Sequence, residues 1–377
     1  MSAASIAPAV RSLFEPFSFG RVTLGNRVAM APMTRSQSPG NIPGENAAAY
    51  YRRRAEGGVG LIITEGTSPG HPASSGYPDV PAFDGEEALA GWKRVVDEVH
   101  AAGGHIIPQL WHVGSIRQLG MGPDPSVPGF GPSPVPHPSF QGKGQPPHEM
   151  TQRDIDETIE AFALSARHAE ALGFDGVEIH GAHSYLIDQF FWSETNRRTG
   201  KYGGDLAERT RFAVELIQAV RASVSREFPV VLRFSQWKQG DYRHKMAGTP
   251  AELERFLAPL SDAGVDVFHA SNRRFDDPEF EGSPLNLAGW AKKLTGKPAI
   301  TVGSVGLDSD FLRSYAGQPA AIARIDALIE RLDRGEFDLV AVGRALLSDP
   351  EWANKVREGR EDAIIPFEPG HLKAPQA

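Results

Sequence analysis

Two histidines and a tyrosine, His180, His183 and Tyr185, follow the short apolar segment 176–180. Neutral imidazoles each present one N–H group, so a pair of them can hold a carbonyl or another partly negative oxygen. A phenol two residues further on can deliver a proton to a neighbouring atom. The same histidines are also consistent with a metal site or with ordinary core packing. The three residues are therefore the first candidates for a catalytic site.

Arg233 is written into another apolar segment, residues 229–235. Burying a guanidinium without a partner costs several kcal/mol of folding free energy, so an anion is expected to lie beside it. The residues leave two partners open. One is a bound anionic ligand, and the other is a carboxylate within the fold such as Glu65.

Two glycine-containing turns come near the end of the chain, Gly303 in the stretch VGSVG (302–306) and the pair Gly343–Arg344. Small residues after a strand let backbone N–H groups approach a phosphate closely. Arg344 would add a charge-assisted contact. A phosphorylated ligand or cofactor is the expectation.

Eight apolar segments, each followed by a helical pattern, must position these groups. The apolar segments are 27–32, 59–65, 105–111, 176–180, 229–235, 265–270, 298–303 and 338–343, and the helical patterns are 45–56, 85–102, 153–173, 207–224, 249–264, 286–294, 320–335 and 350–359. Continuous rather than alternating apolar strands are typical of a parallel sheet that is covered on both faces. The pattern predicts an α/β fold, a single (β/α)8 barrel. An open doubly wound sheet is the alternative, and it would be expected to carry a GxGxxG motif that is missing after the first strand.

In a barrel the carboxyl ends of the strands meet at one mouth, where active sites lie. The strand ends are unusually polar, and besides the residues above they carry Thr34, Arg35, Glu65, Gln109, Trp111 and His112. The barrel is expected over residues 12–365, with tails at 1–11 and 366–377. Residues 113–150 contain nine of the 30 prolines and seven glycines, and they are expected to be either an active-site loop that covers the substrate or surface decoration.

Composition excludes several classes of function. A formal net charge of −8 gives no electrostatic footprint for nucleic acid or an anionic membrane. The absence of cysteine excludes disulfides, iron–sulfur clusters and thiol nucleophiles. No apolar run near the N-terminus is long enough for a signal peptide or a membrane span, so a cytoplasmic protein is expected.

Longer motifs occur in a fixed order over roughly residues 12–360: LGNRVAMAPMTR (24–35), PQLWHVG (108–114), EIHGAHSYLIDQFFWSETNRRTGKYGG (178–204), ERTRF (208–212), LRFS (232–235) and DLVAVGRALLSDPEWANKVREG (338–359). Together they resemble the old yellow enzyme family of flavin-dependent ene-reductases. The resemblance implies a single barrel that holds FMN tightly but non-covalently at its mouth. The residues that match the family's cofactor positions are Pro32, Met33, Thr34, Gly66, Gln109, Arg233, Gly303, Val305, Gly343 and Arg344.

The resemblance also implies the roles of the candidate catalytic residues. His180 and His183 would bind the electron-withdrawing group of the substrate, and Tyr185 would protonate the α-carbon. Tyr77 and Trp111 match positions that shape the substrate pocket. Arg233 would lie beside flavin N1, where a cation stabilises the anionic reduced flavin.

The implied activity is that of an FMN-dependent NAD(P)H oxidoreductase that reduces the activated C=C bond of α,β-unsaturated carbonyls or nitroalkenes. NADPH or NADH would bind transiently over the same flavin face, in a monomer or homodimer without nucleic-acid or membrane partners. Two alternatives remain, a diaphorase-like or sensor flavoprotein and a metal-dependent hydrolase using His180 and His183. Segments 236–248 and 271–282 do not match the family's pattern, so the substrate and any preference between the nicotinamides stay open.

Overall fold

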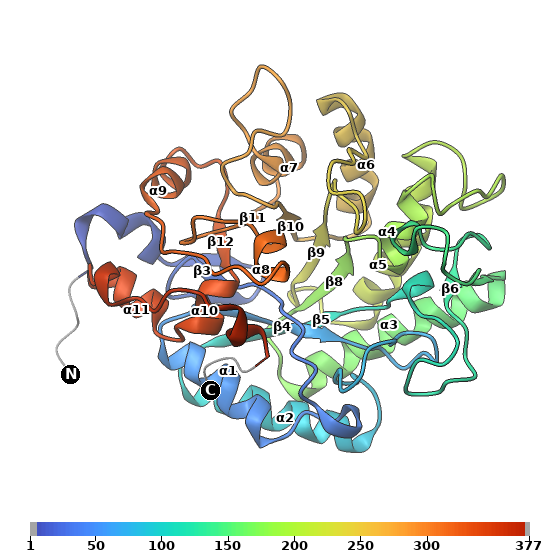
Figure 1. The fold of residues 1–377 in the computed structure, drawn as a ribbon, viewed down its shortest axis with the longest axis horizontal. Coiled ribbons are helices and arrows are strands. Elements are labelled where there is room, and N and C mark those ends of the chain that lie inside the picture. The colour runs from blue at the N-terminus through green and yellow to red at the C-terminus, as the bar shows by residue number, and fades with distance from the viewer. Residues whose placement is uncertain (1–5, 374–377) are drawn as a thin grey trace.

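Eight parallel strands close into a barrel in the computed structural model, which describes residues 6–373 (Figure 1). Around the barrel the strands follow one another as β10, β11, β12, β3, β4, β5, β8 and β9. Their bounds are β3 (Val28–Met30), β4 (Leu61–Thr67), β5 (His105–Leu110), β8 (Val177–Gly181), β9 (Val230–Phe234), β10 (Val267–Ser271), β11 (Ala299–Val302) and β12 (Leu339–Val342). The predicted (β/α)8 barrel is confirmed.

Helices between the strands cover the outside of the barrel (Figure 1). They are α1 (Glu45–Glu56), α2 (Glu86–Ala101), α3 (Gln152–Leu172), α5 (Arg211–Ser223), α6 (Pro250–Asp262), α7 (Leu287–Thr295), α9 (Asp326–Asp333) and α11 (Trp352–Arg357). Their starts follow local sequence signals. Thr151 caps α3 in a capping box with Asp154, and Thr249 caps α6 in the same way with Glu252. At the amino-terminus of each helix, two otherwise unpaired backbone N–H groups are thereby satisfied.

Three short helices, α4 (Leu186–Phe191), α8 (Phe311–Tyr315) and α10 (Arg344–Ser348), are additional to the eight that the pattern predicts. The helix expected over 320–335 begins only at Asp326. The reason is tertiary, because Ala320 forms a bridge with Phe367 and so leaves the preceding segment extended. No helix within residues 6–373 is both long and apolar enough to cross a membrane.

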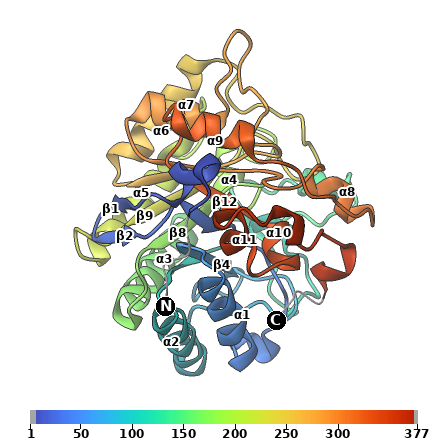
Figure 2. The ribbon, with the colours of Figure 1, turned by 90° about the vertical axis from the view of Figure 1, so that its left-hand side faces the viewer.

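The hairpin of β1 (Phe17–Phe19) and β2 (Val22–Leu24) closes the amino-terminal end of the barrel. Phe19, Val22 and Leu24 are buried in the same apolar cluster as the inward-facing residues of the barrel strands. Figure 2 shows this hairpin at the left and α8 and α10 at the right, on opposite sides of the barrel. With the amino-terminal end covered, a ligand would enter the barrel from the carboxyl end of the strands.

Both expected tails contain packed residues. A 3₁₀ helix spans Pro8–Phe14 and buries Val10, Leu13 and Phe14, so the packed fold begins before residue 12. At the other end Phe367 is fully buried, and its backbone pairs with that of Ala320. The apolar side chains at these positions explain the difference. The outermost parts of the expected tails, residues 1–5 and 374–377, lie outside the described residues.

The proline-rich segment 113–150 is held together by Arg117, which is 1% exposed. The segment contains the short strands β6 (Phe130–Gly131) and β7 (His148–Glu149), which pair in parallel. The guanidinium of Arg117 donates to the carbonyl oxygens of Ser75, Met121, Gly122, Asp124 and Val127. One buried cation thus takes the place of regular secondary structure in satisfying the backbone of this loop.

We expect Arg117→Met to lower the free energy of unfolding by about 3 kcal/mol, because several buried carbonyls lose a charged donor at once. Urea unfolding followed by circular dichroism measures the loss. The matched control is Arg153→Met, since the side chain of Arg153 is 86% exposed and its loss should change stability by less than about 0.5 kcal/mol. Equal losses in the two variants would contradict the role of Arg117.

Candidate active site

A cavity of about 680 Å³ opens at the carboxyl ends of the barrel strands, a size typical of ligand sites. The structure brings nearly all of the predicted site residues to its walls. The predicted residues that line it are Pro32, Met33, Thr34, Tyr77, Gln109, Trp111, His180, His183, Tyr185, Arg233, Gly303, Val305, Gly343 and Arg344.

His180, His183 and Tyr185 converge because the chain turns sharply where β8 ends. His183 and Ser184 both adopt left-handed backbone conformations, with φ of 61° and 59°. The turn is held by the hydroxyl of Ser235, which accepts from the backbone N–H of His183 at 3.0 Å. The ring of His180 consequently lies 5.0 Å from that of His183 and 5.2 Å from that of Tyr185, measured between centroids.

Both imidazoles are neutral at physiological pH. Burial, reinforced by the charge of Arg233, holds the pKa of His180 and of His183 well below the ordinary value for histidine. The backbone N–H of Ala182 donates to Nδ1 of His180 at 3.3 Å, so Nε2 of His180 carries the proton. An N–H donor of this kind suits an oxygen that gains negative charge.

Ser271, at the end of β10, connects His183 to Arg233. Its Oγ lies 2.7 Å from Nε2 of His183 and accepts from Arg233 at 3.3 Å. Trp237 stacks on the face of His183 at 4.3 Å and 17°, and its indole N–H donates to the carbonyl oxygen of Ser271 at 2.8 Å. The orientation of His183 is therefore set from its edge and from its face.

Tyr185 stays protonated at physiological pH. Burial raises the pKa of Tyr185 well above the ordinary value, and a hydrogen bond with Tyr77 raises it further. The ring of Trp111 packs edge-on against Tyr185 at 4.9 Å and stacks with Tyr77 at 5.4 Å. The phenol of Tyr185 thus keeps its proton and is held between the rings of Trp111 and Tyr77.

Arg233 is 7% exposed, and its Nε–H has no hydrogen-bond partner among the described residues. The carboxylate considered from the sequence is occupied elsewhere, because Glu65 pairs with Arg35 at 2.6 Å and also accepts from its backbone N–H at 3.0 Å. Glu65 therefore does not neutralise Arg233. A different carboxylate within the fold does act on it, because burial lowers the pKa of Arg233 and the charge of Glu178 opposes this effect. A buried cation that still has a free donor at a cavity wall fits an anionic or strongly accepting ligand.

Gly303 and Arg344 also line the cavity. Gly303 has a φ of +128°, and a Cβ at this position would lie 2.8 Å from the backbone of Arg273 and Arg274. Only glycine allows this close approach. Arg344 donates to the hydroxyl of Ser314 at 2.6 Å. Glycine backbone beside an arginine at a cavity wall fits a phosphate, so the cavity as a whole fits a phosphorylated cofactor.

The residues that match flavin positions therefore fit the group, and comparison with known proteins agrees. The sequence model of the NADH:flavin oxidoreductase / NADH oxidase family matches residues 12–363. The old yellow enzyme family thus includes this chain.

Individual relatives support the assignment. The chain is 33% identical to 12-oxophytodienoate reductase 2 of Arabidopsis thaliana, over 90% of this chain and 86% of that protein. It is 34% identical to an NADH oxidase of Thermoanaerobacter brockii over 94% of its own length, and it spans about half (52%) of that longer protein. Among solved structures, morphinone reductase in complex with tetrahydroNAD superimposes with a TM-score of 0.77 at 30% identity, covering 96% of this chain and 94% of that one.

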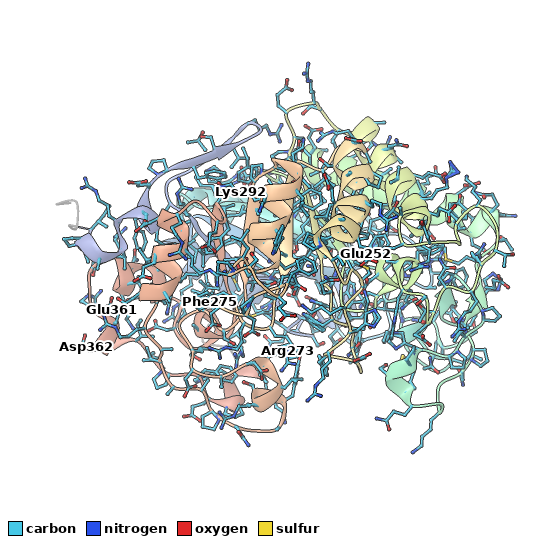
Figure 3. All side chains as sticks on the ribbon, turned by 90° about the horizontal axis from the view of Figure 1, so that it is seen from above. Glu252, Arg273, Phe275, Lys292, Glu361 and Asp362 are labelled. Atoms are coloured by element: carbon cyan, nitrogen blue, oxygen red, sulfur yellow. The ribbon has the colours of Figure 1, made fainter. Side chains whose placement is uncertain are left out.

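In this family member the cavity has walls that the sequence motifs did not identify. They come from the segments after β9 and β10 and from α8, and their residues include Trp237, Tyr242, Arg273, Phe311 and Tyr315. In the view of Figure 3, Arg273 is labelled below Glu252 of α6. Segments 236–248 and 271–282 are the ones that do not match the family's pattern. Both follow predicted strands, and this position could have predicted that they line the cavity.

The proline-rich segment lies beside the cavity. Among the described residues that line the cavity, none belongs to 113–150, and a covering role of this segment over a bound substrate stays a prediction. The segment buttresses the site from behind, where His137 contacts the carbonyl oxygen of Ser184 at 3.1 Å. Arg117 and its carbonyl partners hold this supporting segment together.

Neither the metal alternative nor the role assigned to Gly66 receives support from the geometry. Within residues 6–373, no three or more His, Asp or Glu side chains come together as a metal-binding group, so His180 and His183 lack a third ligand there. Gly66 does not line the cavity. A Cβ on Gly66 would lie 2.4 Å from Cε3 of Trp111, so the glycine makes room for the indole.

We expect Gly66→Ala to displace Trp111 and to destabilise the protein by about 1–3 kcal/mol, the usual cost of overpacking. A denaturant titration gives the stability, and a crystal structure of the variant gives the indole position. Gly25→Ala is the control, because nothing lies within 4 Å of its added Cβ. Unchanged stability and an unmoved indole in the Gly66→Ala variant would contradict this explanation.

Proposed function

We propose that this chain is an FMN-dependent NAD(P)H oxidoreductase that reduces the activated C=C bond of α,β-unsaturated carbonyls or nitroalkenes. The observation that carries the proposal is the meeting of three rings at one wall of the cavity. His180 lies 5.0 Å from His183 and 5.2 Å from Tyr185, and two neutral donors and a protonated phenol thus face one space.

Two groups of residues would hold FMN. Pro32, Met33, Thr34, Gln109 and Arg233 line the cavity and would hold the flavin ring. Gly303, Val305, Gly343 and Arg344 also line it and would hold the phosphate. FMN bound there would supply the hydride for the β-carbon of the substrate. Gly66 could contact the flavin only through its backbone N–H or C=O group, since the indole of Trp111 occupies the space beside its Cα.

His180 and His183 would hold the oxygen of the substrate's carbonyl or nitro group. Hydrogen bonds to this oxygen withdraw electrons from the conjugated double bond and become stronger as negative charge develops on the oxygen. Because burial and Arg233 keep the pKa of both histidines well below 6.5, the pair would donate without charging the pocket. Tyr77 and Trp111 would shape the space for the rest of the substrate.

Tyr185 would give its proton to the α-carbon. The raised pKa of Tyr185 makes the phenol a reluctant acid, which suits a strongly basic enolate-like carbon. NADH or NADPH would bind transiently in the same cavity. In support, the structural relative morphinone reductase has been solved in complex with tetrahydroNAD.

A visible spectrum of the purified protein, followed by anaerobic titration with NADPH and then 2-cyclohexenone, tests the proposal. A flavin band that bleaches and then returns is expected. A protein that is colourless and cannot be reconstituted with FMN would refute the cofactor assignment. Bleaching without recovery would instead favour a diaphorase-like or sensor protein.

We expect Tyr185→Phe to slow the oxidation of the reduced enzyme by 2-cyclohexenone at least about 100-fold, the usual contribution of a positioned acid, and to leave reduction by NADPH nearly unchanged. Stopped-flow absorbance separates the two half-reactions. Tyr202→Phe serves as control, since Tyr202 bonds to Glu215 at 2.8 Å outside the cavity. Equal slowing of both half-reactions would exclude Tyr185 as the proton donor.

Arg233→Met should weaken FMN binding by about tenfold or more, because the variant loses a charge-assisted donor at the cavity wall. It should also make the bound flavin harder to reduce. Fluorescence titration of the apoprotein with FMN measures the affinity. Arg233→Lys keeps the charge and should fall between the wild type and Arg233→Met. Unchanged FMN affinity in the methionine variant would argue against this position for the flavin.

A further inference from the structure

A buried hydrogen-bonded array lies inside the barrel next to Arg233. Glu178 accepts from the side-chain amide of Gln109 at 2.7 Å through Oε1 and contacts Nδ1 of His269 at 2.6 Å through Oε2. The side chains of Glu178 and His269 are fully buried. Neither residue lines the cavity, so neither can touch a substrate.

The position of the array is unusual for this fold. The interior of a (β/α)8 barrel is normally filled by branched apolar side chains, and the inward-facing Ile107, Val231 and Val267 follow that rule here. Burying an ionised carboxylate costs several kcal/mol unless it is paired. Packing alone does not require Glu178 and His269 at these positions.

His269 has one nitrogen left for a proton. Because Nδ1 faces the carboxylate of Glu178, it carries the hydrogen of the neutral ring. Nε2 is then a lone pair, and it is buried without a hydrogen-bond partner among the described residues. The register places His269 beside Arg233 on the neighbouring strand, and Arg233 beside His180 on the next.

Two charges face His269 from the neighbouring strands. Burial lowers the pKa of His269, the carboxylate of Glu178 opposes this effect, and the guanidinium of Arg233 adds to it. The imidazoles of His180 and His183 are the other titratable groups that feel His269, and burial keeps both neutral. With His269 neutral, the positive charge of Arg233 and the negative charge of Glu178 cancel.

Reduction of the flavin would upset that balance. A negative charge on the far side of Arg233 compensates the guanidinium and leaves Glu178 without an opposite charge. A proton on Nε2 of His269 restores neutrality within about one residue's width of Arg233, where electrostatic interactions are strong. We propose that the Glu178–His269 pair is a redox-linked proton site, which binds one proton when the flavin is reduced.

This inference rests on the proposed function, because it needs a bound flavin. The balance of the step is simple. The hydride from NAD(P)H carries two electrons and one proton to the flavin and leaves NAD(P)⁺, and the additional proton comes from solvent and binds Nε2 of His269. The oxidative half-reaction releases this proton again.

The midpoint potential of the bound flavin as a function of pH tests the proposal. Each proton taken up with two electrons changes the equilibrium tenfold per pH unit, about 30 mV. Between the pKa of His269 in the oxidised protein and its higher pKa in the reduced protein, we expect two protons per two electrons, about 60 mV per pH unit. His269→Gln keeps a donor for Glu178 but cannot be protonated, so its slope should fall to about 30 mV per pH unit.

The chain offers a matched control. His105 contacts Asp175 through Nδ1 at 3.0 Å, the same kind of pair, but at the amino-terminal end of β5. His105→Gln should keep the wild-type slope. Glu178→Gln removes the charge that favours the protonated ring, so it should flatten the slope and move the potential upwards because the reduced flavin is then opposed by one negative charge fewer.

A wild-type slope of about 30 mV per pH unit from about pH 6 to about pH 9 would overturn the proposal. An equal slope in His269→Gln and the wild type would also overturn it. Histidine labelled with ¹³C provides a second test in the wild-type holoenzyme. On reduction, the resonance that is missing from His269→Gln, or that shifts in Glu178→Gln, should move to the imidazolium position, and a resonance that stays in place contradicts the proposal. Absence of bound flavin in every variant would refute the proposed function instead.

Discussion

The buried guanidinium of Arg233 is the constraint on which the carboxyl end of the barrel depends. Its charge lies among residues of three neighbouring strands, since His180 and His269 flank it in register on β8 and β10. Burial and this charge keep the pKa of His180 and His183 low, and the hydroxyl of Ser271 contacts both Arg233 and His183. Glu178 supplies the opposite charge below. The open donor of Arg233 then makes an electron-rich ligand part of the stable structure.

The aromatic rings around this cation are positioned by close contacts rather than by flexible side chains. The indole of Trp111 lies close against Gly66 and contacts the rings of both Tyr77 and Tyr185. Trp237 holds the face of His183. A site assembled from rings in contact has little freedom to relax, so Tyr185, His180 and His183 keep fixed positions relative to one another. The buttress formed by residues 113–150 serves the same end.

Glu178 and His269 are buried inside the barrel beside Arg233 and balance its charge. A barrel interior filled only with apolar residues would hold Arg233 without any balancing charge, and the reduced and oxidised states of a neighbouring flavin would then differ by a full uncompensated charge. An imidazole hydrogen-bonded to a carboxylate can absorb that difference by binding a proton. The array therefore connects the electrostatics of the fold with the electrostatics of the reaction.

The sequence by itself determined the barrel, because eight continuous apolar segments with intervening helices have few other ways to bury their surface. It also determined which polar residues end the strands, and the family follows from those motifs. Only the tertiary structure decided the partners. Glu65 pairs with Arg35 rather than with Arg233. Residues 113–150 support the site from outside, whereas residues of 236–248 and 271–282 line the cavity. Pairing and loop placement depend on contacts between residues far apart in the chain, and neither periodicity nor spacing along the chain carries that information.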